Sequence, residues 1–164
     1  YAAALLCLGD CQNALIQMEK VLADDPRNFI ANNCFLSAAF QCKEYNKVIK
    51  AYSYILSIFS VKEDDIKAIE RIFNEEGFIK AYEKIMILLE KIAENNPISP
   101  IDMAMRYIMA NQPDKAMDWL EKGFELHDPA MTYIATKIFN LDPLFNNPRF
   151  IDIVKKMNLP LPKN

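Results

Sequence analysis

The stretch DKAMDWLEKGFELHDP, residues 114–129, is the most regular part of the sequence. Ala116, Leu120 and Gly123 stand at i, i+4 and i+7, which places them on one face of an α-helix. Small and apolar residues return at the same three places at intervals of 34 residues: Ala14, Met18 and Val21; Val48, Tyr52 and Ile55; Tyr82, Met86 and Leu89. A helical face repeated at this fixed period predicts an array of helical repeats.

A second amphipathic segment precedes most of these helices. Residues 29–41, 62–76 and 100–110 carry apolar side chains at helical spacing, so each unit is predicted to be a pair of helices. Gly9-Asp10, Lys43-Glu44 and Asn111-Gln112-Pro113 mark turns inside the units, and Asp25-Pro26 and Asp128-Pro129 mark their boundaries.

Three helix starts can be read from capping residues. Ser60 with Glu63 has the pattern of a capping box, and Ser99 stands as a cap before Pro100 at the first helical position. Asn147 before Pro148 predicts one more short helix, over residues 149–157.

On these residues the chain resembles the tetratricopeptide repeat family. Ala104, Tyr107, Ala116, Leu120 and Gly123 stand where that family has its signature residues. The stretch DPLFNNPRFIDIVKKMNLP, residues 142–160, looks like the terminal capping helix of bacterial repeat proteins. The resemblance implies an all-α fold, a right-handed α-solenoid of antiparallel helix pairs (a TPR-like superhelix) with a C-terminal capping helix.

The expected divisions follow the period. Repeats are expected at residues 1–28, 29–62, 63–96 and 97–128, with the third divergent because Tyr82 replaces a small residue. Capping helices and a tail are expected over 129–164, with Phe145 and Phe150 closing the end of the stack. Tyr1 opens the chain in what reads as the middle of a helix, so we expect a fragment that lacks upstream repeats or domains.

The composition favours a non-catalytic protein. The net charge is −3 without clustered Lys or Arg, so no nucleic acid is expected as a partner. No apolar stretch is long enough for a membrane span. His127 is the only imidazole, and neither a glycine-rich phosphate loop nor paired carboxylates can be recognised. We therefore expect no enzyme activity, no cofactor and no metal.

Four cysteines occur, at positions 7, 11, 34 and 42. Their spacing matches no zinc framework, and we expect small free thiols packed within helices. Free thiols favour a cytoplasmic location, while a periplasmic one stays open.

In the family that the chain resembles, the first helix of each unit lines a concave groove. Carried onto this sequence, the groove has these candidate residues: Asn33, Ser37, Phe40, Gln41, Lys67, Arg71, Asn74, Met105 and Met109. Lys67 and Arg71 lie one turn apart and could hold a carboxylate. The apolar end of the groove, Ile101 with Met105, Ile108 and Met109, is either an open site or covered by residues 141–157.

The resemblance thus implies a scaffold that binds a peptide or another protein through its concave face. The alternative is a regulatory or sensory module of a larger bacterial protein, with a DNA-binding or catalytic domain upstream. Self-association is compatible with both. The divergent unit around Lys67 and Arg71 is the first place where the sequence suggests a specific function.

Overall fold

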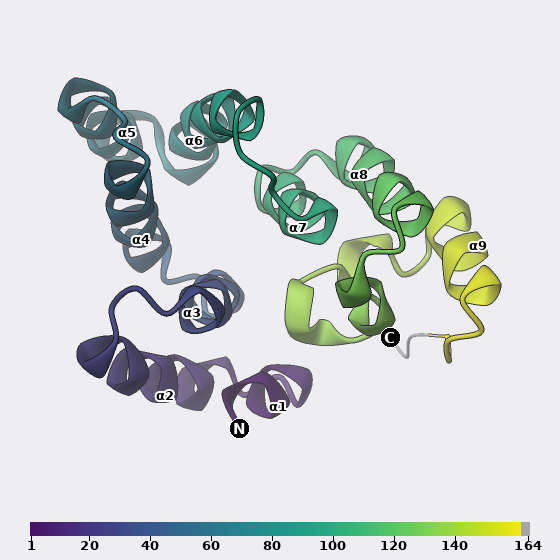
Figure 1. Cartoon of the computed structure of the whole chain (residues 1–164). Coiled ribbons are helices and arrows are strands. Elements are labelled where there is room, and N and C mark those ends of the chain that lie inside the picture. The colour runs from purple at the N-terminus through teal and green to yellow at the C-terminus, as the bar shows by residue number, and fades with distance from the viewer. Residues whose placement is uncertain (162–164) are drawn as a thin grey trace.

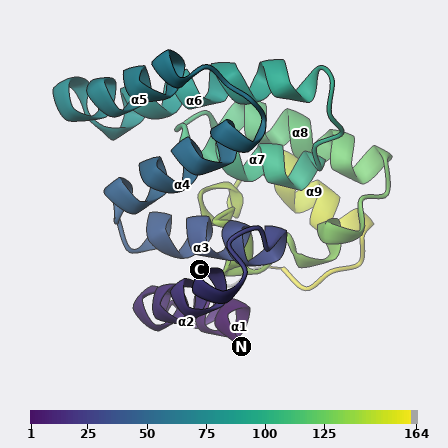
Figure 2. The same cartoon turned by 60° about the vertical axis from the view of Figure 1, so that its left-hand side comes forward.

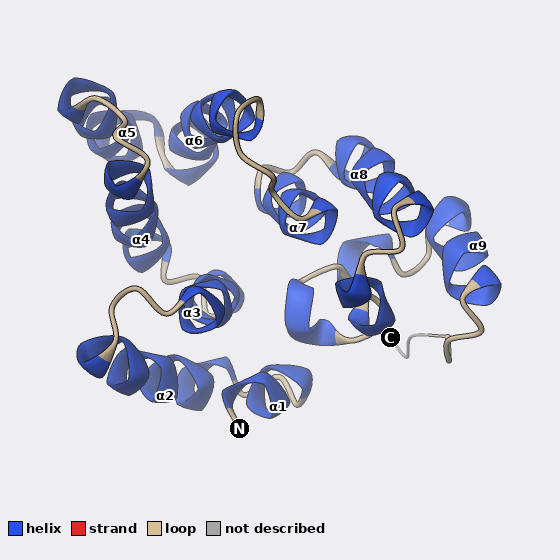
Figure 3. Ribbon diagram, viewed as in Figure 1, coloured by secondary structure: helices blue, strands red, loops and turns tan. Residues whose placement is uncertain are grey.

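The computed structural model describes residues 1–161, the side chain of Phe29 excepted, and within them all regular structure is helical (Figure 3). The α-helices are α1 (Ala2–Cys7), α2 (Cys11–Asp24), α3 (Phe29–Gln41), α4 (Tyr45–Ile58), α5 (Glu63–Glu76), α6 (Phe78–Ala93), α7 (Pro100–Met109), α8 (Pro113–Glu125) and α9 (Pro148–Lys156). Three short 3-10 helices lie between α8 and α9: η1 (Pro129–Tyr133), η2 (Lys137–Phe139) and η3 (Asp142–Leu144). Residues 162–164 of the expected tail lie outside the described part.

Each helix from α1 to α8 packs against the next one along the chain. The helices follow one another around an arc, which begins at α1 and α2 and ends at α8 and α9 (Figure 1). The turned view separates α1 and α2 at one end from α5 and α6 at the other (Figure 2). The segment between α8 and α9 returns toward the start of the chain, as the contacts of η2 with both α1 and α3 show.

The buried side of the helices agrees with the 34-residue period. Ala14, Val48, Tyr82 and Ala116 are the first of the three positions in each unit, and all four are fully buried. Helix packing excludes water from that face, and such burial supplies most of the stability of short helices. The expected phase is therefore confirmed for α4, α6 and α8 and at Ala14 of α2. At the third position of α2 the expectation is wrong, because Val21 is 38% exposed.

The expected helix bounds are close to those observed, but two caps are wrong. Asn147 accepts a hydrogen bond from the Arg149 amide and starts α9, as expected. Ser60 caps nothing: it has a positive φ, and α5 begins after Lys62 without a side-chain cap. Ser99 precedes Pro100 as expected, but its hydroxyl donates to Asp128 instead of accepting from its own helix.

The C-terminal end of the arc is closed by aromatic packing. Phe145 and Phe150 are buried with their ring centroids 5.6 Å apart, which agrees with their expected role at the end of the stack. Helix α9 packs on α8, and Arg149 pairs with Asp118 and Glu121 at 2.7 Å. The two carboxylates fix this exposed guanidinium over α8.

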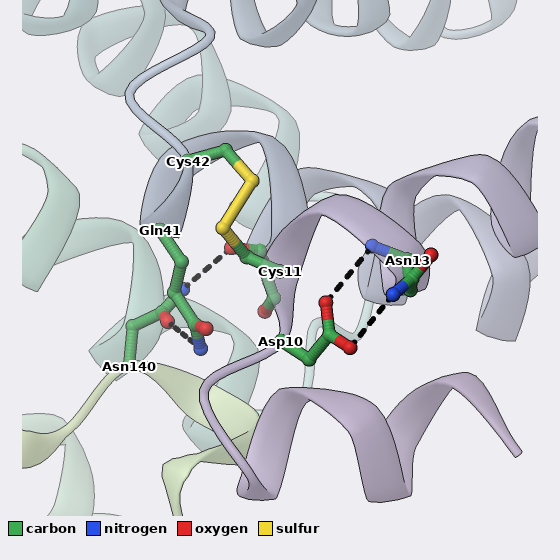
Figure 4. The surroundings of a disulfide bond; sticks show 7 residues. Asp10, Cys11, Asn13, Gln41, Cys42 and Asn140 are labelled. Atoms are coloured by element: carbon green, nitrogen blue, oxygen red, sulfur yellow. Dashed lines mark hydrogen bonds between the residues drawn. A yellow bond between two sulfur atoms is a disulfide. The ribbon is translucent and has the colours of Figure 1, made fainter.

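The expectation of four free cysteines is wrong. Cys11, the first residue of α2, forms a disulfide with Cys42, the residue after α3, and their Cα atoms are 5.7 Å apart (Figure 4). The disulfide therefore joins the start of α2 to the end of α3. Cys7 and Cys34 are free, and Cys7 is exposed rather than packed in the core.

No helix within residues 1–161 combines the length and the apolar character needed to cross a bilayer.

Candidate functional site

Helices α3 and α7 meet across the inner side of the arc, although their contacting residues are almost 70 positions apart. Asn33 Nδ2 lies 3.5 Å from Asp102 Oδ1, and Ser37 Oγ lies 3.3 Å from Met105 Sδ. Three of these residues were expected to line an open groove. Because side chains of α3 and α7 touch here, the open space on the inner side of the arc is smaller than the expected groove.

The segment after α8 is held inside the arc by Gln41 and Asn140. Gln41 Nε2 donates to Asn140 Oδ1 at 2.7 Å and to the Lys137 carbonyl at 3.0 Å (Figure 4 shows the two side chains). Asn140 Nδ2 in turn reaches the Ser37 carbonyl at 3.4 Å. Asn140 is buried and left-handed at φ 56°, a conformation that Asn tolerates better than most residues. These bonds fix η2 against the end of α3.

Between α1, α3, α7 and residues 128–139 a cavity of about 640 Å³ remains. Its walls are mostly apolar: Ala3 comes from α1, Ile30 from α3, Met105 from α7, and Tyr133 and Ile138 from the returning segment. This volume is typical of sites that enclose a drug-sized ligand or a few side chains. Ile30 is 74% exposed and Tyr133 is 53% exposed, so the rim of the cavity presents apolar side chains to solvent.

Two carboxylates line the cavity. Asp128 is well satisfied, because its Oδ2 accepts from Ser99 at 2.7 Å and its Oδ1 accepts from the Ala130 amide at 2.9 Å. Asp102 is only 9% exposed. Burial raises the pKa of its carboxyl above the ordinary value, the Arg106 guanidinium opposes this, and Asp128 adds to it.

Behind Asp102 lies a buried polar cluster that joins α4, α6 and α7. Tyr52 and Tyr82 share a hydrogen bond of 2.7 Å between their hydroxyls, and Tyr82 contacts Met109 Sδ at 3.4 Å. Arg106 is 5% exposed and donates to the Asp102 carbonyl at 2.8 Å. Burial disfavours its charge, but Tyr52 and Asp102 outweigh this effect, and the pKa of Arg106 stays above its usual value. The Arg106 cation is therefore buried in this cluster and is not among the residues that line the cavity.

The predicted groove residues fall into three groups. Asn33, Ser37 and Met105 line the cavity. Phe40, Gln41 and Met109 have structural contacts: Phe40 packs against Phe78, Gln41 holds Asn140, and Met109 is buried beside Tyr82. Lys67, Arg71 and Asn74 are exposed on α5 and are not among the residues that line the cavity.

At the carboxylate site expected from Lys67 and Arg71, one of the two cations already has a carboxylate partner within the chain. Lys67 Nζ pairs with Glu63 Oε1 at 2.8 Å on the same helix. At the other end of the predicted groove, Ile101, Met105, Ile108 and Met109 are all buried. The cavity that Met105 lines is also lined by residues within 128–139, upstream of residues 141–157, the stretch expected as the alternative cover.

Sequence reasoning missed Asp102, Asp128 and the returning segment. A signal for Asp102 was present, because Asp102 and Arg106 stand at i and i+4 in an otherwise apolar helix. Asp128 was recognised only as a boundary residue. No three His, Cys, Asp or Glu side chains within residues 1–161 are grouped so that they could hold a metal ion.

The chain matches no family model, no curated protein and no solved structure.

Proposed function

We propose that this chain is a non-catalytic binding module of tetratricopeptide type, a right-handed superhelix of antiparallel helix pairs, and that it holds a segment of another protein on its concave side. The binding site is the cavity between α1, α3, α7 and residues 128–139. The observation that carries the proposal is this cavity, whose walls are apolar and whose rim leaves Ile30 and Tyr133 exposed.

One feature favours a protein segment over a fully enclosed small molecule. The apolar rim extends the contact surface beyond the cavity, so residues next to an inserted side chain can pack against Ile30 and Tyr133. The wall is also assembled from elements that are fixed by Gln41, Asn140 and the Cys11–Cys42 bond. A preformed wall lowers the ordering cost of binding for any ligand that the cavity takes.

Selection of peptides from a random display library tests this function. The immobilised protein is used for selection, and each enriched peptide is then titrated against two variants by isothermal titration calorimetry. Ala3→Trp places an indole in the cavity wall, whereas Ala4→Trp adds the same group to the exposed neighbouring position of α1. A steric block at the cavity predicts an affinity loss of about tenfold or more for Ala3→Trp only.

Urea unfolding of both variants checks that α1 remains folded, and Ala130→Trp, at a lining residue after α8, gives a second block. Enriched peptides that bind the wild type and both blocked variants equally well would place binding elsewhere. A library that yields no cavity-dependent peptide would count against the proposed function itself.

A further inference from the structure

The Asp102 carboxylate lines the cavity and has unused hydrogen-bonding capacity. Both contacts to its Oδ1 are long: Asn33 Nδ2 lies at 3.5 Å and Arg106 Nη1 at 3.9 Å. An ionised carboxylate offers about four lone-pair sites. The other carboxylate of the cavity, Asp128, in contrast accepts a short bond on each of its oxygens. A hydrogen bond from an incoming donor therefore contributes more binding free energy at a nearly buried carboxylate with only long contacts than at a carboxylate whose oxygens already have short bonds.

The charge inside the cavity is negative. Asp102 and Asp128 both line it, and none of the described residues that line it is Lys, Arg or His. The nearest cation, Arg106, is buried behind Asp102, where it donates to the Asp102 backbone carbonyl and meets Tyr52. An incoming anion would therefore meet two carboxylates before it reached the guanidinium, whereas an incoming cation would meet Asp102 directly.

The remaining lining complements the stem of a basic side chain. Met105, Ala130 and Ile138 are apolar and suit the methylene groups that Lys and Arg bury along apolar surfaces. Tyr133 stands at the rim with 53% of its surface exposed, where an aromatic face can attract a cation. Ile30 also lines the cavity and is exposed, so it offers a contact for an apolar neighbour of the basic residue.

From these contacts we infer that the cavity selects a protein segment in which a lysine or arginine is flanked by apolar residues, with the cationic head on Asp102 and the stem against Met105. This inference rests on the proposed binding function and names the class of segment that the same site takes. It assigns Asp102 as the residue that sets specificity, with Asn33 orienting its carboxylate.

The test compares the peptides that depend on the cavity, as judged by Ala3→Trp against Ala4→Trp. We expect these peptides to share a lysine or arginine between apolar residues. For the strongest one, the basic residue is replaced by norleucine, which keeps the stem and removes the charge, and separately by glutamate. A charge-assisted bond to a nearly buried carboxylate predicts an affinity loss of about tenfold for norleucine and a larger loss for glutamate.

Asp102→Asn should remove most of that discrimination while the norleucine peptide binds both proteins similarly. Cavity-dependent peptides without a basic residue, or equal affinities for the lysine and norleucine peptides, would overturn the charge preference but leave the binding function standing. n-Butylammonium chloride serves as the free-amine probe. If it bound as tightly as the peptide, the cavity would be a small-amine site and the inference of a protein segment would be wrong.

Discussion

Replacement of Asn140 by alanine tests whether the returning segment is fixed inside the arc. The variant removes the bond from Gln41 Nε2 at 2.7 Å and the longer bond to the Ser37 carbonyl at 3.4 Å. Each such bond contributes about 1 kcal/mol net. Alanine at φ 56° and ψ 31° costs about 1 kcal/mol more, since asparagine tolerates the left-handed region better than alanine does. The free energy of unfolding should therefore fall by about 3 kcal/mol, the sum of these contributions.

Asn158→Ala is the matched control. Asn158 is also left-handed, at φ 55°, but its side chain is exposed. This variant should show only the backbone cost of about 1 kcal/mol. Urea unfolding followed by circular dichroism gives both values, and hydrogen exchange reports on residues 137–140. If the two variants lost equal stability and exchange at 137–140 were unchanged, the segment would not be held by Asn140 in solution.

Three further predictions concern the elements around the cavity. Reduction of Cys11–Cys42, which closes a loop of 31 residues, should lower the free energy of unfolding by up to about 4 kcal/mol in urea titrations, while Cys7→Ser changes little; equal stability of the oxidised and reduced protein would contradict this. Tyr82→Phe leaves the buried Tyr52 hydroxyl without its 2.7 Å partner and should cost about 1–3 kcal/mol, whereas a neutral result in urea would mean that Tyr52 finds another partner. Burial raises the pKa of the Asp102 carboxyl in the folded protein, so ionisation of this group opposes folding at pH values above that pKa. The cost falls as the pH drops through the folded-state pKa and is gone below the ordinary pKa of the unfolded chain, so the stability of the wild type relative to Asp102→Asn should rise on acidification. A stability difference that does not change with pH in paired urea titrations would refute this expectation.

Local periodicity predicted the helices well, because burial in a helix pair repeats with the helical turn. Ala14, Val48, Tyr82 and Ala116 were recognised from spacing alone, and all are fully buried. The capping error at Ser60 has a different cause. Its residue type fits a cap, but the chain adopts a left-handed conformation there and delays α5 until Glu63.

The cavity could not be predicted in the same way, since its walls come from parts of the chain that are far apart in sequence. Gln41 and Asn140 are 99 positions apart, and no local pattern connects them. The segment 129–144 consists of short 3-10 helices without a regular apolar period, so its return toward α1 and α3 had no signal. The expected groove on α5 relied on repeat equivalence alone, and Lys67 there faces solvent beside Glu63.

The sequence carries a weak signal for the Cys11–Cys42 bond. The two positions are 31 residues apart, close to one repeat period, and each adjoins a turn between helices. In stacked helix pairs such positions come near one another. The spacing of Cys11 and Cys42 is therefore related to the repeat period rather than to a zinc motif.

The most direct test of the binding site is the resonance of the Met105 methyl group during titration with a peptide selected from the library. Met105 lines the cavity, whereas Met86 is buried in α6 and is not among the lining residues. Methyl-labelled methionine gives one signal for each, and Met105→Leu assigns the first. Our account predicts that the Met105 signal shifts with peptide concentration while the Met86 signal stays in place. A saturating peptide that leaves Met105 unchanged would contradict binding in the cavity.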